Sequence, residues 1–143
     1  MVKVKKHIDI DAPIEKVFDY MADPQQYVEI WPSMVEVKNC EESSHGGVDF
    51  DWVYKMGGMP FKGRSKVVEF VENERSVSVN EEGIRSKFIW EYKPHNGGTA
   101  VDLNVEYTVP MPVLGKLAEK VIVKLNENEA ETLLNNLKAV MET

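Results

Sequence analysis

The sequence has few of the residues on which disulfides, zinc sites, membrane spans and nucleic-acid contacts depend. Its one cysteine, Cys40, excludes an intramolecular disulfide and a zinc site built on paired cysteines. No run approaches 18 apolar residues, and Met1–Lys6 lacks the apolar core of a signal peptide. Lys and Arg total 17 against 24 Asp and Glu, and the net charge of −7 argues against a general nucleic-acid binder. We therefore expect a cytoplasmic protein with no transmembrane segment.

Sequence motifs of common catalytic and cofactor sites are also missing. The chain contains no phosphate loop, dinucleotide fingerprint, HExxH or GxSxG motif. His7 falls on the polar side of an expected strand, and His45 and His95 fall at separate turns, so we expect no shared metal. Cys40 has no base identifiable beside it, and we expect a small buried thiol there. The sequence thus predicts no metal ion and no cofactor.

The first third of the chain predicts a strand followed by two short helices. Residues 2–10 alternate between apolar and polar side chains, which is typical of a strand with one buried face. Asp11 is expected to cap a helix that has Pro13 in its first turn. The apolar residues that follow at helical spacing are Ile14, Val17, Phe18 and Met21. Asp23, followed by proline, predicts a second helix start, and that helix must end before Pro32.

The rest of the chain predicts an antiparallel meander and a long helix. Turn signals rich in glycine and asparagine separate six expected strands, near 33–41, 48–56, 61–72, 75–81, 85–93 and 99–109. Residues 113–141 return to helical spacing. The polar run Asn126–Glu129 interrupts their apolar stripe, which would allow a bend or an exposed turn. Residues 1–143 contain no linker or repeat, so we expect a single domain.

The dimensions of these elements predict a curled sheet. A helix of about 29 residues is roughly 43 Å long but only about 10–12 Å across. Seven strands about 4.8 Å apart make a sheet roughly 34 Å wide. A flat sheet would leave much of its apolar face in water, so the sheet should curl around the helix, with the two short helices covering the remaining side. Such an arrangement leaves room for an internal cavity.

Short motifs near both ends of the chain support a family resemblance. They are Ile8–Pro13, Val17-Phe18, Asp23, Trp31-Pro32, Val105–Tyr107, Pro110–Pro112 and Leu134–Lys138. Together with the order of elements, they resemble the polyketide cyclase/dehydrase-like branch of the START/Bet v1 (SRPBCC) superfamily. The resemblance implies an α+β helix-grip fold with a ligand cavity between sheet and long helix. It does not imply one activity, because members bind lipids, hormones, quinones or polyketides and only some are enzymes.

Three strands carry aromatic side chains on one face, and we expect that face to line the cavity. Apolar walls with a few polar groups suit a flat, lipophilic, partly oxygenated ligand, such as a lipid, a quinone or a polyketide-like molecule. The alternative is that the same side chains simply fill the core. The candidate ligand-binding residues are Trp31, Phe50, Trp52, Tyr54, Met56, Met59, Phe88, Trp90, Tyr92, Leu103, Tyr107, Met111, Leu117 and Val121.

One end of the meander is expected to collect several methionines and to form the entrance. Met59 and Met111 would form the gate, and Gly57-Gly58 would let the Met59 loop move. The alternative is a methionine-rich cap of the core. Lys116, Lys120 and Lys124 recur every four residues nearby; such a row is either a solvated face or a contact for anionic lipid headgroups.

The leading hypothesis is a carrier or sensor that encloses a hydrophobic small molecule. A polyketide cyclase or dehydratase is the second hypothesis, for which a buried carboxyl such as Glu69 or Glu81 would act as acid or base. The third is a protein-interaction module that uses the methionine-rich end as a groove.

Overall fold

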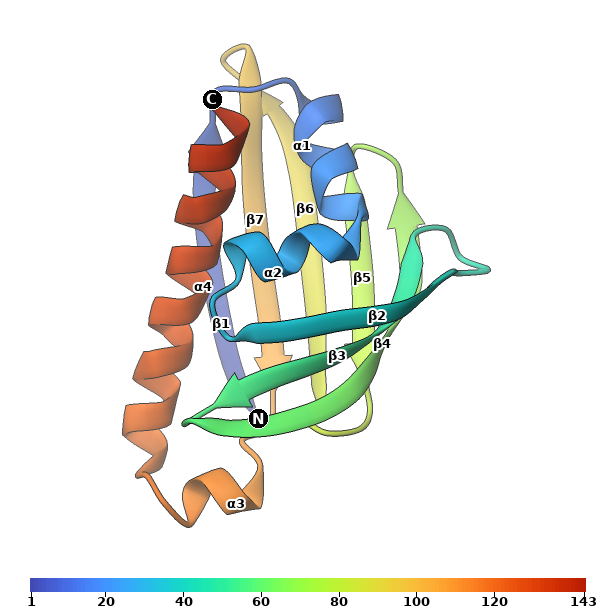
Figure 1. Ribbon diagram of the computed structural model, residues 1–143. Helices are drawn as coiled ribbons and strands as arrows, with labels where there is room; N and C mark the ends of the chain where they lie inside the picture. The colour runs from blue at the N-terminus through green and yellow to red at the C-terminus, as the bar shows by residue number, and fades with distance from the viewer.

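Seven antiparallel strands form one sheet in the computed structural model, which describes residues 1–143 (Figure 1). Their order across the sheet is β1-β7-β6-β5-β4-β3-β2. The expected meander and the expected α+β helix-grip fold are both confirmed. The strands are β1 (Val2–Ile10), β2 (Met34–Glu42), β3 (Val48–Met56), β4 (Met59–Val71), β5 (Arg75–Asn80), β6 (Ser86–His95) and β7 (Gly98–Tyr107).

Short helices connect β1 to β2, as expected. They are α1 (Ile14–Ala22), the 3-10 turn η1 (Pro24–Gln26) and α2 (Tyr27–Ile30). Asp23 caps η1, because its carboxylate accepts a hydrogen bond from the Gln25 backbone N–H at 3.1 Å. The expected cap by Asp11 is wrong: Pro13 is the N-cap residue, and the Asp11 N–H instead donates to Glu142 at 2.8 Å.

The expected single helix over residues 113–141 is two helices, α3 (Met111–Leu114) and α4 (Glu119–Met141). Gly115 ends α3, and Ala118 has an extended backbone with φ −62° and ψ 144°, so the chain changes direction before α4 begins. Helix α4 then continues through Asn126–Glu129 without a break. The polar run therefore lies inside a continuous helix and does not form a turn.

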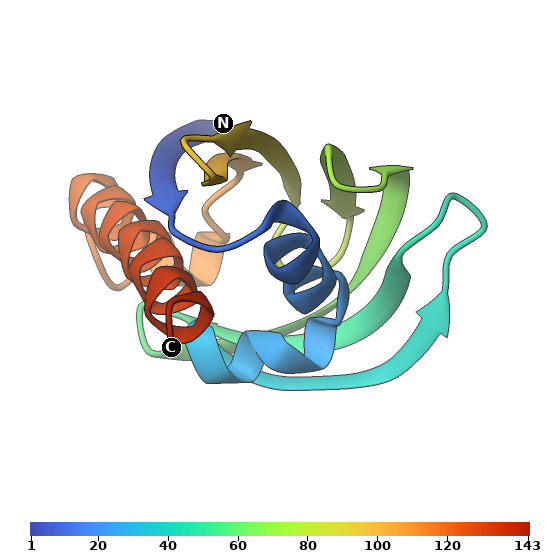
Figure 2. The same cartoon turned by 90° about the horizontal axis from the view of Figure 1, so that it is seen from above.

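The sheet curls so that its concave face surrounds the helices (Figure 2). Strand pairing places Val4, Val105 and Phe88 in one row on this concave face. On the convex face, His7 accompanies Asp102 and Glu91. A core of 27 buried residues fills much of the concave side. The apolar residues that alternate along β1, β3, β6 and β7 thus face the concave side of the sheet, and most of the polar residues between them face the convex side.

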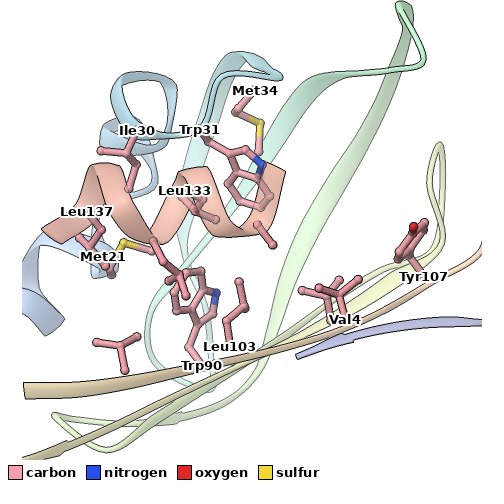
Figure 3. Packing of buried hydrophobic residues seen from close by; sticks show 14 of the residues in the cluster. Val4, Met21, Ile30, Trp31, Met34, Trp90, Leu103, Tyr107, Leu133 and Leu137 are labelled. Atoms are coloured by element: carbon pink, nitrogen blue, oxygen red, sulfur yellow. The ribbon is translucent and has the colours of Figure 1, made fainter. Parts of the chain in front are cut away.

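Helix α4 packs against this concave side through its C-terminal half. Leu133, Leu134 and Leu137 are at most 2% exposed. Leu133 and Leu137 lie above Trp90 and Leu103 of the sheet in Figure 3. None of the helices combines the length with the apolar character needed to cross a bilayer.

The expectation of a buried thiol at Cys40 is wrong, because Cys40 is exposed. It lies on β2, which forms one edge of the sheet. The pairing of β2 with β3 shifts register between Lys38 and Glu41, so this part of the strand leaves the packed layer.

Candidate ligand-binding cavity

A cavity of about 130 Å³ lies between the concave face of the sheet and the helices. Thirty residues line it, and 21 of them are hydrophobic. Its volume is far above the roughly 10–15 Å³ that one water molecule needs. The curled sheet therefore leaves space beneath it for a small organic molecule.

Aromatic side chains from α2 and three strands form much of the wall. The Trp31 ring lies 5.4 Å from the Phe88 ring and 5.8 Å from the Tyr54 ring, so it reaches from the helix layer to the sheet. Figure 3 shows Trp31 and Trp90 on opposite sides of this region. Nine of the 14 candidate residues line the cavity: Trp31, Phe50, Trp52, Tyr54, Met56, Phe88, Trp90, Leu103 and Tyr107.

The other five candidate residues lie outside this cavity. Tyr92 is covered by Phe18 of α1, with ring centroids 5.1 Å apart, and lines only a small adjoining space. Met59 and Leu117 pack against the core from its edge. Met111 is 77% exposed and Val121 is 46% exposed, because α3 and the first turns of α4 extend past the sheet.

The turn proposed as a mobile gate is a tight two-residue hairpin. Gly57 and Gly58 have φ of +60° and +79°, the conformation that two-residue hairpin turns favour and that glycine adopts without strain. A Cβ at Gly57 would lie 3.1 Å from Val113 and 3.3 Å from Ile122, so this turn packs against both α3 and α4.

One end of the cavity carries polar groups from α4 and two tyrosines. The Asn126 amide donates to the Tyr107 hydroxyl at 2.9 Å, and Glu129 accepts from the Ser33 N–H at 2.7 Å. Burial, helped by the Glu129 carboxylate, raises the pKa of the Tyr54 hydroxyl well above its ordinary value. Burial also raises the pKa of Tyr107. Both phenols are therefore neutral at physiological pH and act as hydrogen-bonding groups.

Asn126 and Glu129 were missed as candidate site residues. The interruption of the apolar stripe at Asn126–Glu129 was the signal that could have found them. Polar residues on the inner stripe of a helix are retained where that helix faces a cavity, and here both residues line it.

A second polar patch lines the cavity on the sheet side. Trp52 Nε1 donates to the Asn80 amide oxygen at 2.8 Å, and the Asn80 amide donates to the Ser86 hydroxyl at 3.0 Å. Ser86 donates in turn to the Ile84 carbonyl at 3.1 Å. Ser65, Ser76 and Ser78 complete the patch. The sequence does not predict these serines as lining residues, because alternating serine and valine does not show which face of a strand points inward.

Neither carboxyl considered as an inward acid points into the cavity. Glu69 and Glu81 are exposed, and Glu69 forms an ion pair with Arg75 at 2.9 Å. Glu129 is the single carboxylate among the lining residues. His7 lies on the convex face, where hydrogen bonds to Asp102 and Asp9 raise its pKa. The titratable groups of the convex face are thus separated from the cavity by the sheet.

A curled seven-stranded sheet with a cavity beneath a C-terminal helix defines a START-like, helix-grip fold. The family model described as "Polyketide cyclase / dehydrase and lipid transport" matches residues 1–142, and the chain belongs to this family. No curated protein sequence matches it.

Solved structures support the same fold. The protein TTHA0849 from Thermus thermophilus is 26% identical, with a TM-score of 0.74 over 96% of this chain and 95% of that chain. A START superfamily protein from Mycobacterium smegmatis is 16% identical, with a TM-score of 0.81 over 98% and 97%. The Zhui aromatase/cyclase from Streptomyces sp. R1128 is 15% identical, with a TM-score of 0.76 over 99% and 93%.

Proposed function

We propose that the protein binds a hydrophobic small molecule in this cavity and acts as its carrier or sensor. The observation that carries the proposal is a partly open cavity of about 130 Å³ with a mainly hydrophobic wall. Pockets of this kind bury most of a ligand's surface while a few polar groups fix its orientation. The family description, which names both cyclases and lipid transport, is compatible with this role.

Binding rather than acid–base chemistry is favoured by the state of the polar groups. Burial raises the pKa values of all three tyrosines on the wall, Tyr27, Tyr54 and Tyr107, so none of them is a base at neutral pH. Glu129 already accepts a hydrogen bond from a backbone N–H. These groups orient a bound molecule, and we expect that the ligand leaves the protein chemically unchanged.

Intrinsic fluorescence gives a direct test, because all three tryptophans line the cavity. Titration with quinones, sterols or fatty acids should quench or shift this emission saturably. The variant Ala130→Leu adds bulk to a lining position of α4 and should weaken binding about tenfold or more. Ala139→Leu makes the same change at an exposed position of the same helix and should leave affinity unchanged.

Native mass spectrometry of freshly purified protein complements this titration. A co-purified small molecule, lost in Ala130→Leu but retained in Ala139→Leu, would identify the natural ligand. Equal loss in both variants would place the molecule outside the cavity and contradict the proposal. Conversion of the added ligand into a product would instead support the enzyme hypothesis.

We further propose that, as a carrier, the protein contacts an anionic membrane surface through α3 and the first turns of α4. Met111, Leu114, Val121 and Leu125 are between 37% and 77% exposed there, whereas most other exposed large apolar side chains are scattered over the molecule. The row of Lys116, Lys120 and Lys124 lies in the same segment, although the whole chain is acidic. Exposed apolar groups beside cations complement anionic lipid headgroups.

Sedimentation with vesicles tests this contact. Binding should be stronger to vesicles that contain phosphatidylserine than to pure phosphatidylcholine vesicles. Reversing the charge of Lys120 and Lys124 should reduce binding by roughly fivefold or more per lysine, since each contributes about 1 kcal/mol near such a surface. Lys87→Glu, on an exposed position of β6, is the control. Equal binding to both kinds of vesicle would contradict the contact.

A further inference from the structure

Strand β5 presents its polar side chains to the cavity and its valines to the convex face. Ser76, Ser78 and Asn80 line the cavity. Val77 pairs with Glu69 and Ile89 on the opposite face and is 3% exposed. The strand is therefore inverted relative to β6 and β7, whose aromatic and aliphatic side chains face inward.

Neighbouring strands extend this polar wall. Asn80 pairs with Ser65 of β4 on one side and with Ser86 of β6 on the other. Side chains that pair directly across antiparallel strands are about 4.5–5.5 Å apart and share one face. Ser76, Ser78 and Asn80 follow one another at about 6.7 Å along β5. The result is a continuous patch of four hydroxyls and one amide on an otherwise mainly apolar wall.

Three hydroxyls of this patch have no protein partner. Its hydrogen bonds join Trp52, Asn80, Ser86 and the Ile84 carbonyl, which leaves the hydroxyls of Ser65, Ser76 and Ser78 free. Ser65 is only 5% exposed. None of the three oxygens is fully buried, so each hydroxyl is open to the cavity and can bond to its contents, either water or a ligand.

The charge of the wall restricts what those contents can be. No Lys, Arg or His is among the 30 lining residues, and Glu129 is the one charged group. A carboxylate or phosphate transferred from water into this space would lose its hydration, meet no cation and be repelled by Glu129. Neutral hydroxyls, ketones, ethers and amides can pair with serine hydroxyls without that penalty.

We propose that the ligand is a neutral hydrophobic molecule with hydrogen-bonding oxygens along one edge, which lies against Ser65, Ser76 and Ser78. This inference rests on the proposed function and narrows its ligand class: free fatty acids and phospholipids are disfavoured, and oxygenated neutral ring compounds are favoured. The aromatic wall contacts the apolar faces of the ligand, and the serines select the positions of its oxygens.

Three probes of one skeleton test the proposal: naphthalene, 2,7-dihydroxynaphthalene, which carries both oxygens along one edge, and naphthalene-2-carboxylate. Affinities are measured by two-dimensional NMR titration that follows the indole N–H signals of Trp31, Trp52 and Trp90. The diol should bind roughly threefold to tenfold more tightly than naphthalene, as expected for one or two net hydrogen bonds. The carboxylate should bind at least tenfold more weakly than the diol.

Variants of the wall assign the selectivity to particular residues. The double variant Ser76→Ala and Ser78→Ala should reduce the affinity for the diol to that for naphthalene and leave the hydrocarbon unaffected. Ser78→Thr retains a hydroxyl and should preserve the preference. Ser44→Ala, at an exposed turn position, is the matched control. Glu129→Gln removes the repelling charge and should increase carboxylate binding severalfold. The glutamine oxygen can still accept the hydrogen bond from the Ser33 N–H, so the local structure is retained.

The outcomes separate this inference from the proposed function. Binding of naphthalene and the diol with equal affinity would overturn the polar-wall assignment while leaving a hydrophobic-ligand carrier in place. The polar-wall assignment would also be overturned if the carboxylate bound most tightly, or if the double serine variant kept the preference for the diol. The proposed carrier function would again remain. Failure of all three probes to bind would overturn the proposed function and this inference with it.

Discussion

The two halves of α4 have similar sequences and different surroundings. Leu133 and Leu137 in the C-terminal half are at most 1% exposed. In the N-terminal half Ile122 is equally buried, but Val121 and Leu125 are 46% and 49% exposed. Both halves carry apolar residues at helical spacing, so periodicity alone does not distinguish them. The difference arises because the C-terminal half lies against the core, whereas the first turns of α4 extend past the sheet and bury only Ile122 completely.

The hydrogen bonds of α4 also differ between its C-terminal end and the rest of the helix. The C-terminal end of α4 is attached to the end of β1 and to α1: Lys138 donates to the Asp9 carbonyl at 2.7 Å, and Lys16 donates to the Met141 carbonyl at 2.8 Å. The N-terminal half instead places Asn126 and Glu129 on the cavity wall. The C-terminal end of the helix therefore holds it to the fold, and its middle, from Asn126 to Leu133, borders the space in which a ligand would lie.

Truncation of a leucine in each half should give the largest contrast. Leu137→Ala removes a fully buried side chain and should lower the free energy of unfolding by about 2–5 kcal/mol. Leu125→Ala removes a half-exposed side chain and should change it by no more than about 0.5 kcal/mol. Urea denaturation followed by circular dichroism measures both. Similar losses would show that the two halves contribute equally to stability, and the comparison would fail.

Two asparagines of α4, Asn136 and Asn126, test the same comparison with smaller expected changes in stability. Asn136 donates to the Ile30 carbonyl at 2.9 Å, and Asn136→Ala should cost about 1–2 kcal/mol, because it leaves a buried backbone acceptor unpaired. Asn126 donates to the Tyr107 hydroxyl, which lines the cavity and can bond to its contents. Asn126→Ala should therefore change stability by less than about 0.5 kcal/mol but alter ligand affinity. A ligand-binding defect confined to Asn136→Ala would reverse this assignment.

The inward faces of β3, β6 and β7 were predictable because their large apolar side chains alternate with charged ones. The buried face is clear from pairs such as Phe50 and Trp52, or Val101 and Leu103, which are large, apolar and separated by a charged residue. Strand β5 has no such contrast. Serine and valine are both small, and ion pairs of Arg75 with Glu69 and Glu91 on the convex face accompany the burial of Val77 there.

The ends of helices were less predictable than the middle. The apolar spacing from Leu114 onward continues across Gly115–Ala118, although the backbone leaves the helical conformation there. On both sides of the break the chain packs against the hairpin turn at Gly57, through Val113 of α3 and Ile122 of α4, and that turn is far away in the sequence. Local periodicity contains no information on such contacts, and for the same reason the gate predicted at Met59 and Met111 could not be placed relative to the cavity.

The smallest expected effect is a pH-dependent contribution of Glu142 at the C-terminal end of α4. A hydrogen bond from the Asp11 N–H and another from Lys138 lower the pKa of Glu142 below its ordinary value of 4.5. A carboxyl whose pKa is lower in the folded state stabilises the fold above the unfolded-state pKa and loses that contribution as the pH falls through the folded-state pKa.

Glu142→Gln should therefore be slightly less stable than the parent at pH 7, and the difference should shrink below about pH 4. Denaturant midpoints of both proteins across this range measure it. Glu127→Gln, in the N-terminal half of the helix, is the matched control and should show no comparable change in its difference from the parent. A Glu142 difference that stays constant into acid would mean that the carboxylate charge does not hold this end of α4 to the Asp11 backbone.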